Sequence, residues 1–121
     1  MADEIKLTIK GKVTNGEYKT DWSFSQFSVD QAASGAASGV QSVGTSAENI
    51  AGGDVSTPGY LFLKNIDSTN YVDVGVDNTG FVAMAKLKAG EQACFRVAGS
   101  TTIQLKANTA TCKVQYLLLE D

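Results

Sequence analysis

The sequence predicts an all-β protein, a single antiparallel β-sandwich of the jelly-roll or a related Greek-key type with about eight strands. Three observations lead to this prediction. Turn signals built from Gly, Asn, Asp and Ser recur about every eight to twelve residues. Between them, apolar and polar residues alternate with the period of two that is typical of strands, and no stretch shows a helical period. Periodicity does not give the order of the strands in the sheets, so both sandwich types remain open.

Two strands are expected near the N-terminus. Residues 5–13, IKLTIKGKV, place isoleucine, leucine and valine on one side and lysine or threonine on the other, which is the pattern of a half-buried strand. An Asn-Gly turn signal then leads into a second strand over residues 18–29. The apolar positions of this strand change parity near Ser25 and Gln26, which predicts a β-bulge there.

A flexible arm is expected after these strands. Residues 31–44 are small, uncharged and repetitive, and they hold few large apolar groups. Gly35 and Gly39 each disfavour a helix by about 1 kcal/mol, so we predict a loop or arm, with a short helix as the alternative. Val43 and Ile50 are positioned to anchor a short strand or turn beyond it.

The remainder of the chain predicts a regular series of strands joined by short turns. Two patterns support this, a continuous apolar run starting at Tyr60 and a strict alternation around Val74. The expected strands cover residues 60–66, 70–76, 81–87, 92–97, 102–107 and 112–120.

The composition indicates one compact domain without an obvious active site. The chain has 121 residues, 43% of them hydrophobic, and we expect residues 1–121 to form a single domain. It contains no histidine, which excludes Ser-His-Asp and Cys-His catalysis and the common zinc enzyme sites. We therefore expect a binding or structural protein that is not an enzyme and needs no cofactor.

The charge distribution is unfavourable for nucleic-acid binding. The net charge is −3, Arg96 is the single arginine, and the basic residues are spread out except at Lys6, Lys10 and Lys12. No apolar stretch approaches the length that a membrane span requires, and the N-terminus lacks the pattern of a secretory leader. We expect synthesis in a cytoplasm and neither nucleic acid nor membrane as partner.

The two cysteines are expected to pack in the core and to have no metal-binding or redox role. Cys94 and Cys112 lie in separate apolar segments and do not form a C-x-x-C pair, so a metal site or thioredoxin-like redox role is unsupported. We expect two reduced, buried thiols, with an inter-strand disulfide as the alternative.

Two segments resemble parts of small structural proteins of tailed bacteriophages. They are GYLFLKNIDSTNYV at residues 59–72 and LKAGEQACFRV at residues 87–97, within a similarity that covers roughly residues 43–119. The nearest functional group is the capsid cement or decoration proteins, which are compact β-sandwiches. The resemblance implies a virion component on the outer capsid surface that binds the major capsid protein and forms a homo-oligomer, a dimer or trimer. Tail, neck and fibre modules are the other virion parts it allows, and it identifies no functional residue.

Two segments are the candidates for partner binding. The alternating lysines of the first strand could dock on an acidic surface, or simply form a solvated face that protects a sheet edge. The small-residue arm could become ordered on a neighbouring molecule, or remain a passive loop. The candidate residues are Lys6, Lys10, Lys12, Gly35, Gly39 and Val40.

Aromatic residues form a third candidate surface. Tyr18, Trp22 and Phe24 share one parity and could form a flat platform for a sugar or a partner protein, as in a carbohydrate-binding sandwich. More often such a stripe belongs to the core.

Several oxygen donors lie near strand ends. They could form a calcium site, but their spacing matches no known calcium loop, and turn chemistry and a solvent-facing strand position explain them without metal. The residues are Asp67, Asp73, Asp77 and Asn78.

Overall fold

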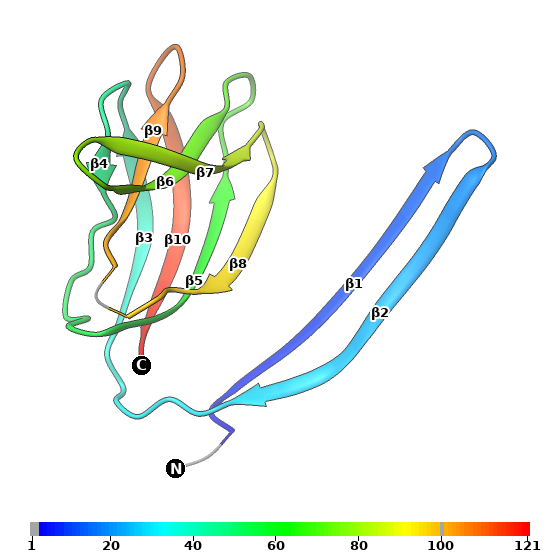
Figure 1. Ribbon diagram of the computed structural model, residues 1–121, viewed down its shortest axis with the longest axis horizontal. Coiled ribbons are helices and arrows are strands. Elements are labelled where there is room, and N and C mark those ends of the chain that lie inside the picture. The colour runs from blue at the N-terminus through cyan, green and yellow to red at the C-terminus, as the bar shows by residue number, and fades with distance from the viewer. Residues whose placement is uncertain (1–2, 100) are drawn as a thin grey trace. The chain divides into compact units, whose positions relative to one another are not determined.

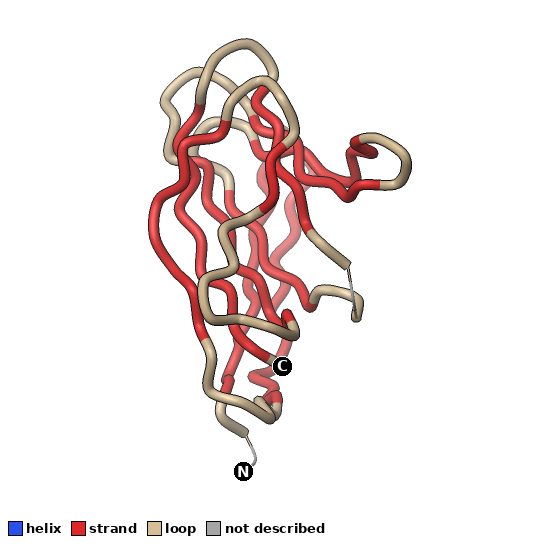
Figure 2. Tube along the Cα trace, turned by 90° about the vertical axis from the view of Figure 1, so that its left-hand side faces the viewer, coloured by secondary structure: helices blue, strands red, loops and turns tan. Residues whose placement is uncertain are grey.

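The computed structural model describes residues 3–99 and 101–121 and shows an all-β protein, as predicted. Within these residues there are ten strands, all paired antiparallel, and Figure 2 shows strands and loops but no helix. The described chain has no helix long and apolar enough to cross a membrane. The chain divides into two compact units, Met1–Ala32 and Ala33–Asp121.

The first unit is a long β-hairpin (Figure 1). It consists of β1 (Ile5–Asn15) and β2 (Tyr18–Val29), which pair over their whole lengths. Gly16 in the connecting turn has a φ of 60°, a conformation that glycine adopts without steric cost.

The predicted β-bulge is confirmed in this hairpin. The register changes between Leu7 and Ile9, where Ser25 and Gln26 of β2 face a single residue of β1. The extra residue restores the apolar side chains of β2 to the same face after the change of parity.

The second unit is a β-sandwich of two four-stranded sheets (Figure 1). One sheet has the order β3-β10-β5-β8 and the other the order β4-β9-β6-β7. The strands are β3 (Ala36–Val43), β4 (Glu48–Asn49), β5 (Pro58–Asn65), β6 (Val72–Asp77), β7 (Phe81–Leu87), β8 (Gln92–Arg96), β9 (Ile103–Ala107) and β10 (Cys112–Glu120).

The connectivity of the sandwich is that of a jelly roll. The pairs β6–β7, β5–β8, β4–β9 and β3–β10 enclose one another in sequence, as in one long hairpin that is then rolled so that β10 also pairs with β5 and β9 with β6. The sandwich has eight strands, but they are not the eight that the sequence predicts. Strands β3 and β4 belong to it and the two N-terminal strands do not, so the described chain has ten strands and not about eight.

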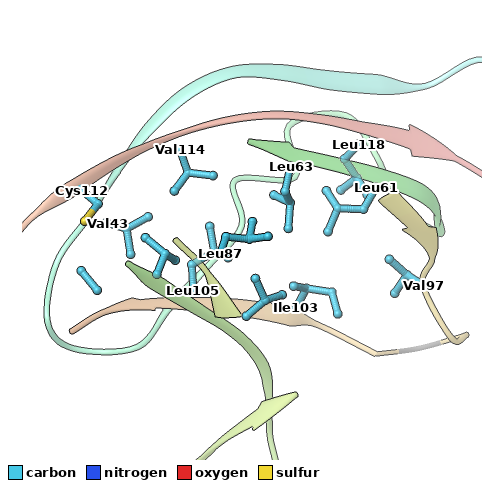
Figure 3. Close-up of a cluster of buried hydrophobic side chains, with 13 residues drawn as sticks. Val43, Leu61, Leu63, Leu87, Val97, Ile103, Leu105, Cys112, Val114 and Leu118 are labelled. Carbon is cyan, nitrogen blue, oxygen red and sulfur yellow. The ribbon is translucent and has the colours of Figure 1, made fainter. Parts of the chain in front are cut away.

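The core lies between the two sheets (Figure 3). Strands β5, β6, β9 and β10 contribute alternate residues to it, for example Leu61 and Leu63 from β5 and Val72 and Val74 from β6. The buried apolar residues are Val43, Leu61, Leu63, Val72, Val74, Leu87, Val97, Ile103, Leu105, Ala107, Cys112, Val114 and Leu118. All of them lie in the second unit, so the sandwich packs on its own side chains.

The prediction of a flexible arm over residues 31–44 is wrong, because Ala36–Val43 forms β3 and pairs with β10. Gln41 holds this strand in place, since its side-chain amide donates to the carbonyl of Asn49 at 2.9 Å and accepts from the N–H of Ala51 at 3.0 Å. The pairing strand β10 is distant in sequence, and Asn49 and Ala51 lie eight and ten residues beyond Gln41. The small side chains of the segment do not predict this pairing or these hydrogen bonds.

The structure also corrects the predicted domain boundary. We expected one sandwich over residues 1–121, but the two strands up to Val29 form a separate two-stranded sheet and no buried core residue comes from them. The alternation in residues 5–13 shows a two-faced strand correctly, yet it does not reveal which layer that strand joins.

Candidate functional site

The hairpin gathers its large apolar side chains on one face. Residues directly opposite each other in an antiparallel pair lie on the same face, and β1 pairs Ile9 with Phe24 and Gly11 with Trp22. Every position on this face is uncharged. We call it the apolar face, and its large residues are Ile5, Leu7, Ile9, Val13, Tyr18, Trp22, Phe24, Phe27 and Val29.

The Trp22 ring lies over Gly11 in the middle of this face. The indole ring occupies the space that a β-carbon on Gly11 would need, so the absence of a side chain at Gly11 lets the ring cross from β2 onto β1. The centre of the apolar face is therefore aromatic.

Much of the apolar face is accessible to solvent. Six of its large residues expose more than a third of their surface: Tyr18 61%, Phe24 60%, Trp22 41%, Ile9 40%, Phe27 37% and Val13 36%. The prediction that the aromatic stripe belongs to the core is therefore wrong. Parity correctly placed Tyr18, Trp22 and Phe24 on one face, but whether anything covers that face is not encoded locally.

The opposite face of the hairpin carries lysines. Even-numbered positions of β1 point to this side, and β2 adds Lys19 opposite Thr14 and Asp21 opposite Lys12. No ion pair among the described residues involves these lysines. We call this surface the lysine face, defined by Lys6, Lys10, Lys12 and Lys19, all of which are exposed.

Gly35, Gly39 and Val40 lie in the second unit, so the structure does not assign the six candidate binding residues to one surface. The carbonyl of Gly35 accepts a hydrogen bond from the N–H of Glu120 at 2.8 Å just before β3 begins. Gly39 faces Tyr116 across the β3–β10 pair, and Val40 is 55% exposed. Gly39 and Val40 lie in a paired strand and Gly35 directly precedes it, so the arm proposed for these three residues is not present.

The sandwich contains a cavity at the end of its core. Its volume is about 320 Å³, and its walls include Leu61, Val97 and Leu118 together with the polar residues Asn49 and Ser56. None of its described lining residues is an acid, a base or a cysteine, so its serine and threonine hydroxyls have no general base beside them in the lining.

The carboxylates near strand ends bond to their own turns. Asp67 accepts hydrogen bonds from the N–H groups of Asn70 at 2.7 Å and Thr69 at 2.9 Å, and these bonds lower the pKa of its carboxyl group. Asp77 similarly accepts from the N–H of Gly80 at 3.0 Å. The described residues include no cluster of three or more groups able to hold a metal ion, and turn chemistry accounts for these contacts.

The two thiols differ in environment. Cys112 is buried and free, as predicted, and burial raises the pKa of its thiol. The expectation is wrong for Cys94, which is exposed because Ala93 and Phe95, its neighbours in β8, take the inward positions.

The sequence matches no protein-family model and no curated protein.

Proposed function

We propose that this chain is a non-enzymatic structural protein of a tailed-phage virion, a decoration protein that binds the outer capsid surface and strengthens the contacts between capsomers. The observation that carries this proposal is the two-faced hairpin, which forms a unit distinct from the sandwich core. A ribbon with one lysine face and one apolar face suits protein surfaces and offers nothing to a small substrate.

The lysine face is the part proposed to contact the shell. Lys6 and Lys12 lie at the two ends of a row that is about 20 Å long, given the rise of roughly 3.4 Å per strand residue. The row carries no ion pair within the described chain, so its charges are available to an acidic partner. Such complementarity directs encounter and orientation, and its strength depends on salt.

Repetition on a shell compensates for weak single contacts. A capsid presents the same acidic surface many times, and an oligomer of this chain would engage several of them together. The major capsid protein is the proposed partner, and the virion surface is the proposed location.

Binding to purified shells tests the proposal. The full chain should co-sediment with capsids of the phage that encodes it, and K6E/K10E/K12E should bind at least ~10-fold more weakly because the row then repels an acidic surface. The control K64E/K88E/K113E makes the same charge change at exposed lysines of the sandwich and should bind like the wild type.

Two results would count against this assignment. If the wild-type chain fails to sediment with shells even at low salt, the decoration role is wrong. If both triple variants lose binding equally, net charge matters and the lysine face does not. A copy number of a few to tens per particle would instead indicate a tail, neck or fibre module.

A carbohydrate-binding role is the alternative that the exposed aromatic rings favour. Tyr18, Trp22 and Phe24 could stack on sugar rings, but the same face offers only Asn15, Thr20 and the Tyr18 hydroxyl to hydrogen-bond them. A glycan array with the wild-type chain and W22A separates this role from the proposed one.

A further inference from the structure

We infer that the apolar face of the hairpin is a self-association surface, covered by the apolar face of a second copy of this chain. The two hairpins would form a four-stranded, two-layer sheet sandwich with their lysine faces outward. This inference concerns a different face from the one proposed to bind the shell and does not depend on that proposal.

The first argument is the number of strands. A hairpin of two strands is marginally stable at best in water, and a third strand or a packed layer is needed for independent stability. Here β1 and β2 form a sheet of their own, and they still pair without interruption apart from one bulge. A second hairpin packed face to face supplies the missing layer at the usual sheet spacing of about 10 Å.

The second argument is the size of the face. The exposed parts of its four aromatic side chains together equal about two complete aromatic side chains, or ~400 Å². With the exposed aliphatic groups and the ribbon edges, two such faces bury roughly 1,200 Å² in total, the lower limit for a stable specific interface. A contiguous exposed apolar patch of several hundred Å² is often an interaction site.

The third argument is charge. A pairing of two identical faces usually risks bringing like charges together, but the apolar face has no charged residue at any position. The lysines lie on the opposite side of each ribbon and point away from the pair. Every folded copy of the chain carries this face. A second copy is therefore always present at the same concentration as the first.

The centre of the face is suited to such packing. The Trp22 ring lies over Gly11, so it covers both strands at the middle of the ribbon. Aromatic side chains at the centre of an interface contribute most to affinity.

The experiment uses the full chain and the intrinsic fluorescence of its tryptophan. Trp22 is the single tryptophan of the sequence, so its fluorescence reports directly on the apolar face. Sedimentation velocity of the wild-type chain should show a discrete oligomer, a dimer in the simplest two-fold arrangement. Dilution should dissociate it and shift the Trp22 emission to longer wavelength.

Two variants at neighbouring positions distinguish a role of the apolar face from a general effect of added charge. F24E places a charge on the apolar face and should weaken self-association at least ~100-fold, which is the effect expected at a central aromatic contact. S23E places the same charge one residue away on the lysine face and should associate like the wild type. Circular dichroism of the sandwich should be unchanged in both variants, which shows that they are folded.

The outcomes are distinguishable from those of the shell-binding test. A wild-type chain that sediments as a monomer at all accessible concentrations overturns the inference, whatever the variants do. A monomer whose F24E variant loses binding to shells shows that a capsid protein covers the face, which also overturns it. A discrete oligomer that F24E dissociates supports the inference even if no shell is bound.

Discussion

At the scale of single residues, two buried polar side chains hold the ends of the sandwich together. Asn65, fully buried at the end of β5, donates to the carbonyls of Asn70 at 2.9 Å and Leu87 at 3.0 Å, and its amide oxygen accepts from the N–H of Asp67. It thereby joins the β5–β6 connection to the end of β7. Among the described residues no buried side-chain polar atom lacks a partner.

Glu120 has a similar role at the end of β10. Its side chain is 8% exposed, and its carboxylate accepts hydrogen bonds from the N–H of Thr57 at 2.8 Å and the hydroxyl of Ser56 at 2.9 Å. The bond from Thr57, and then that from Ser56, lowers the pKa of this carboxyl group from its ordinary value of 4.5.

This pKa shift predicts a pH-dependent contribution to stability. A folded-state pKa below the unfolded one means that the stabilisation is fully present above pH 4.5 and is lost as the pH falls through the folded-state pKa. The variant E120Q should therefore be less stable than the wild type at neutral pH, and the difference should shrink below about pH 4.5. Urea unfolding of both proteins across this range measures it; a difference independent of pH would show that the carboxylate charge contributes nothing.

At the scale of elements, the β6–β7 pair depends on a glycine. Its register changes between Val74 and Gly75, and Met84 of β7 is the extra residue of this bulge. A β-carbon on Gly75 would overlap the carbonyl oxygen of Val82 and lie 2.9 Å from the ring of Phe81. The two strands approach too closely there for any side chain.

The variant G75A should consequently weaken the sandwich. We expect the free energy of unfolding to fall by about 2–3 kcal/mol, because the backbone of β7 must move to make room. The control G99A adds the same methyl group where no atom lies within 4 Å, and its stability should change little. Equal stability of the two variants in chemical denaturation would contradict the close approach at Gly75.

Strand β3 is an element that local sequence patterns do not predict. Its residues, AASGVQSV, have neither the β-branched content nor the alternation that predicts a strand. Pairing with the leucine-rich β10 and the two hydrogen bonds of Gln41 hold it in the sheet. A residue with weak intrinsic preference takes its conformation from its partners.

At the scale of the whole molecule, the chain combines a self-contained jelly roll with a hairpin that needs a partner. The thirteen buried apolar residues of the described chain all lie between Val43 and Leu118. All eight strands of its two sheets, β3 to β10, begin after Ala32. The sandwich therefore has the core and the strands required to fold without the first unit.

Removal of residues 1–32 tests this division. The chain 33–121 should unfold cooperatively, with a midpoint within about 5 °C of the sandwich transition of the full chain, a difference of about 1 kcal/mol. Calorimetry and circular dichroism measure it. A truncated chain without a cooperative transition would show that the jelly roll depends on the hairpin.

The sequence by itself determined the class of the fold, most of its strands and the two faces of the hairpin. Turn residues and period-two patterns are local signals, and they identified the strands after Tyr60, the bulge at Ser25 and Gln26, and the common face of Tyr18, Trp22 and Phe24. The sequence also excluded chemistry that requires histidine, because the chain contains no histidine and this follows from the composition without a structure.

Only the tertiary structure decided the division into two units, the strand order and which apolar residues lie in a core. These properties depend on contacts between residues far apart in the chain, such as β3 with β10, and alternation looks the same whether or not a second layer covers the strand. For that reason Val74 and Trp22 both stand in alternating strand patterns, yet Val74 is buried and Trp22 is 41% exposed on the hairpin.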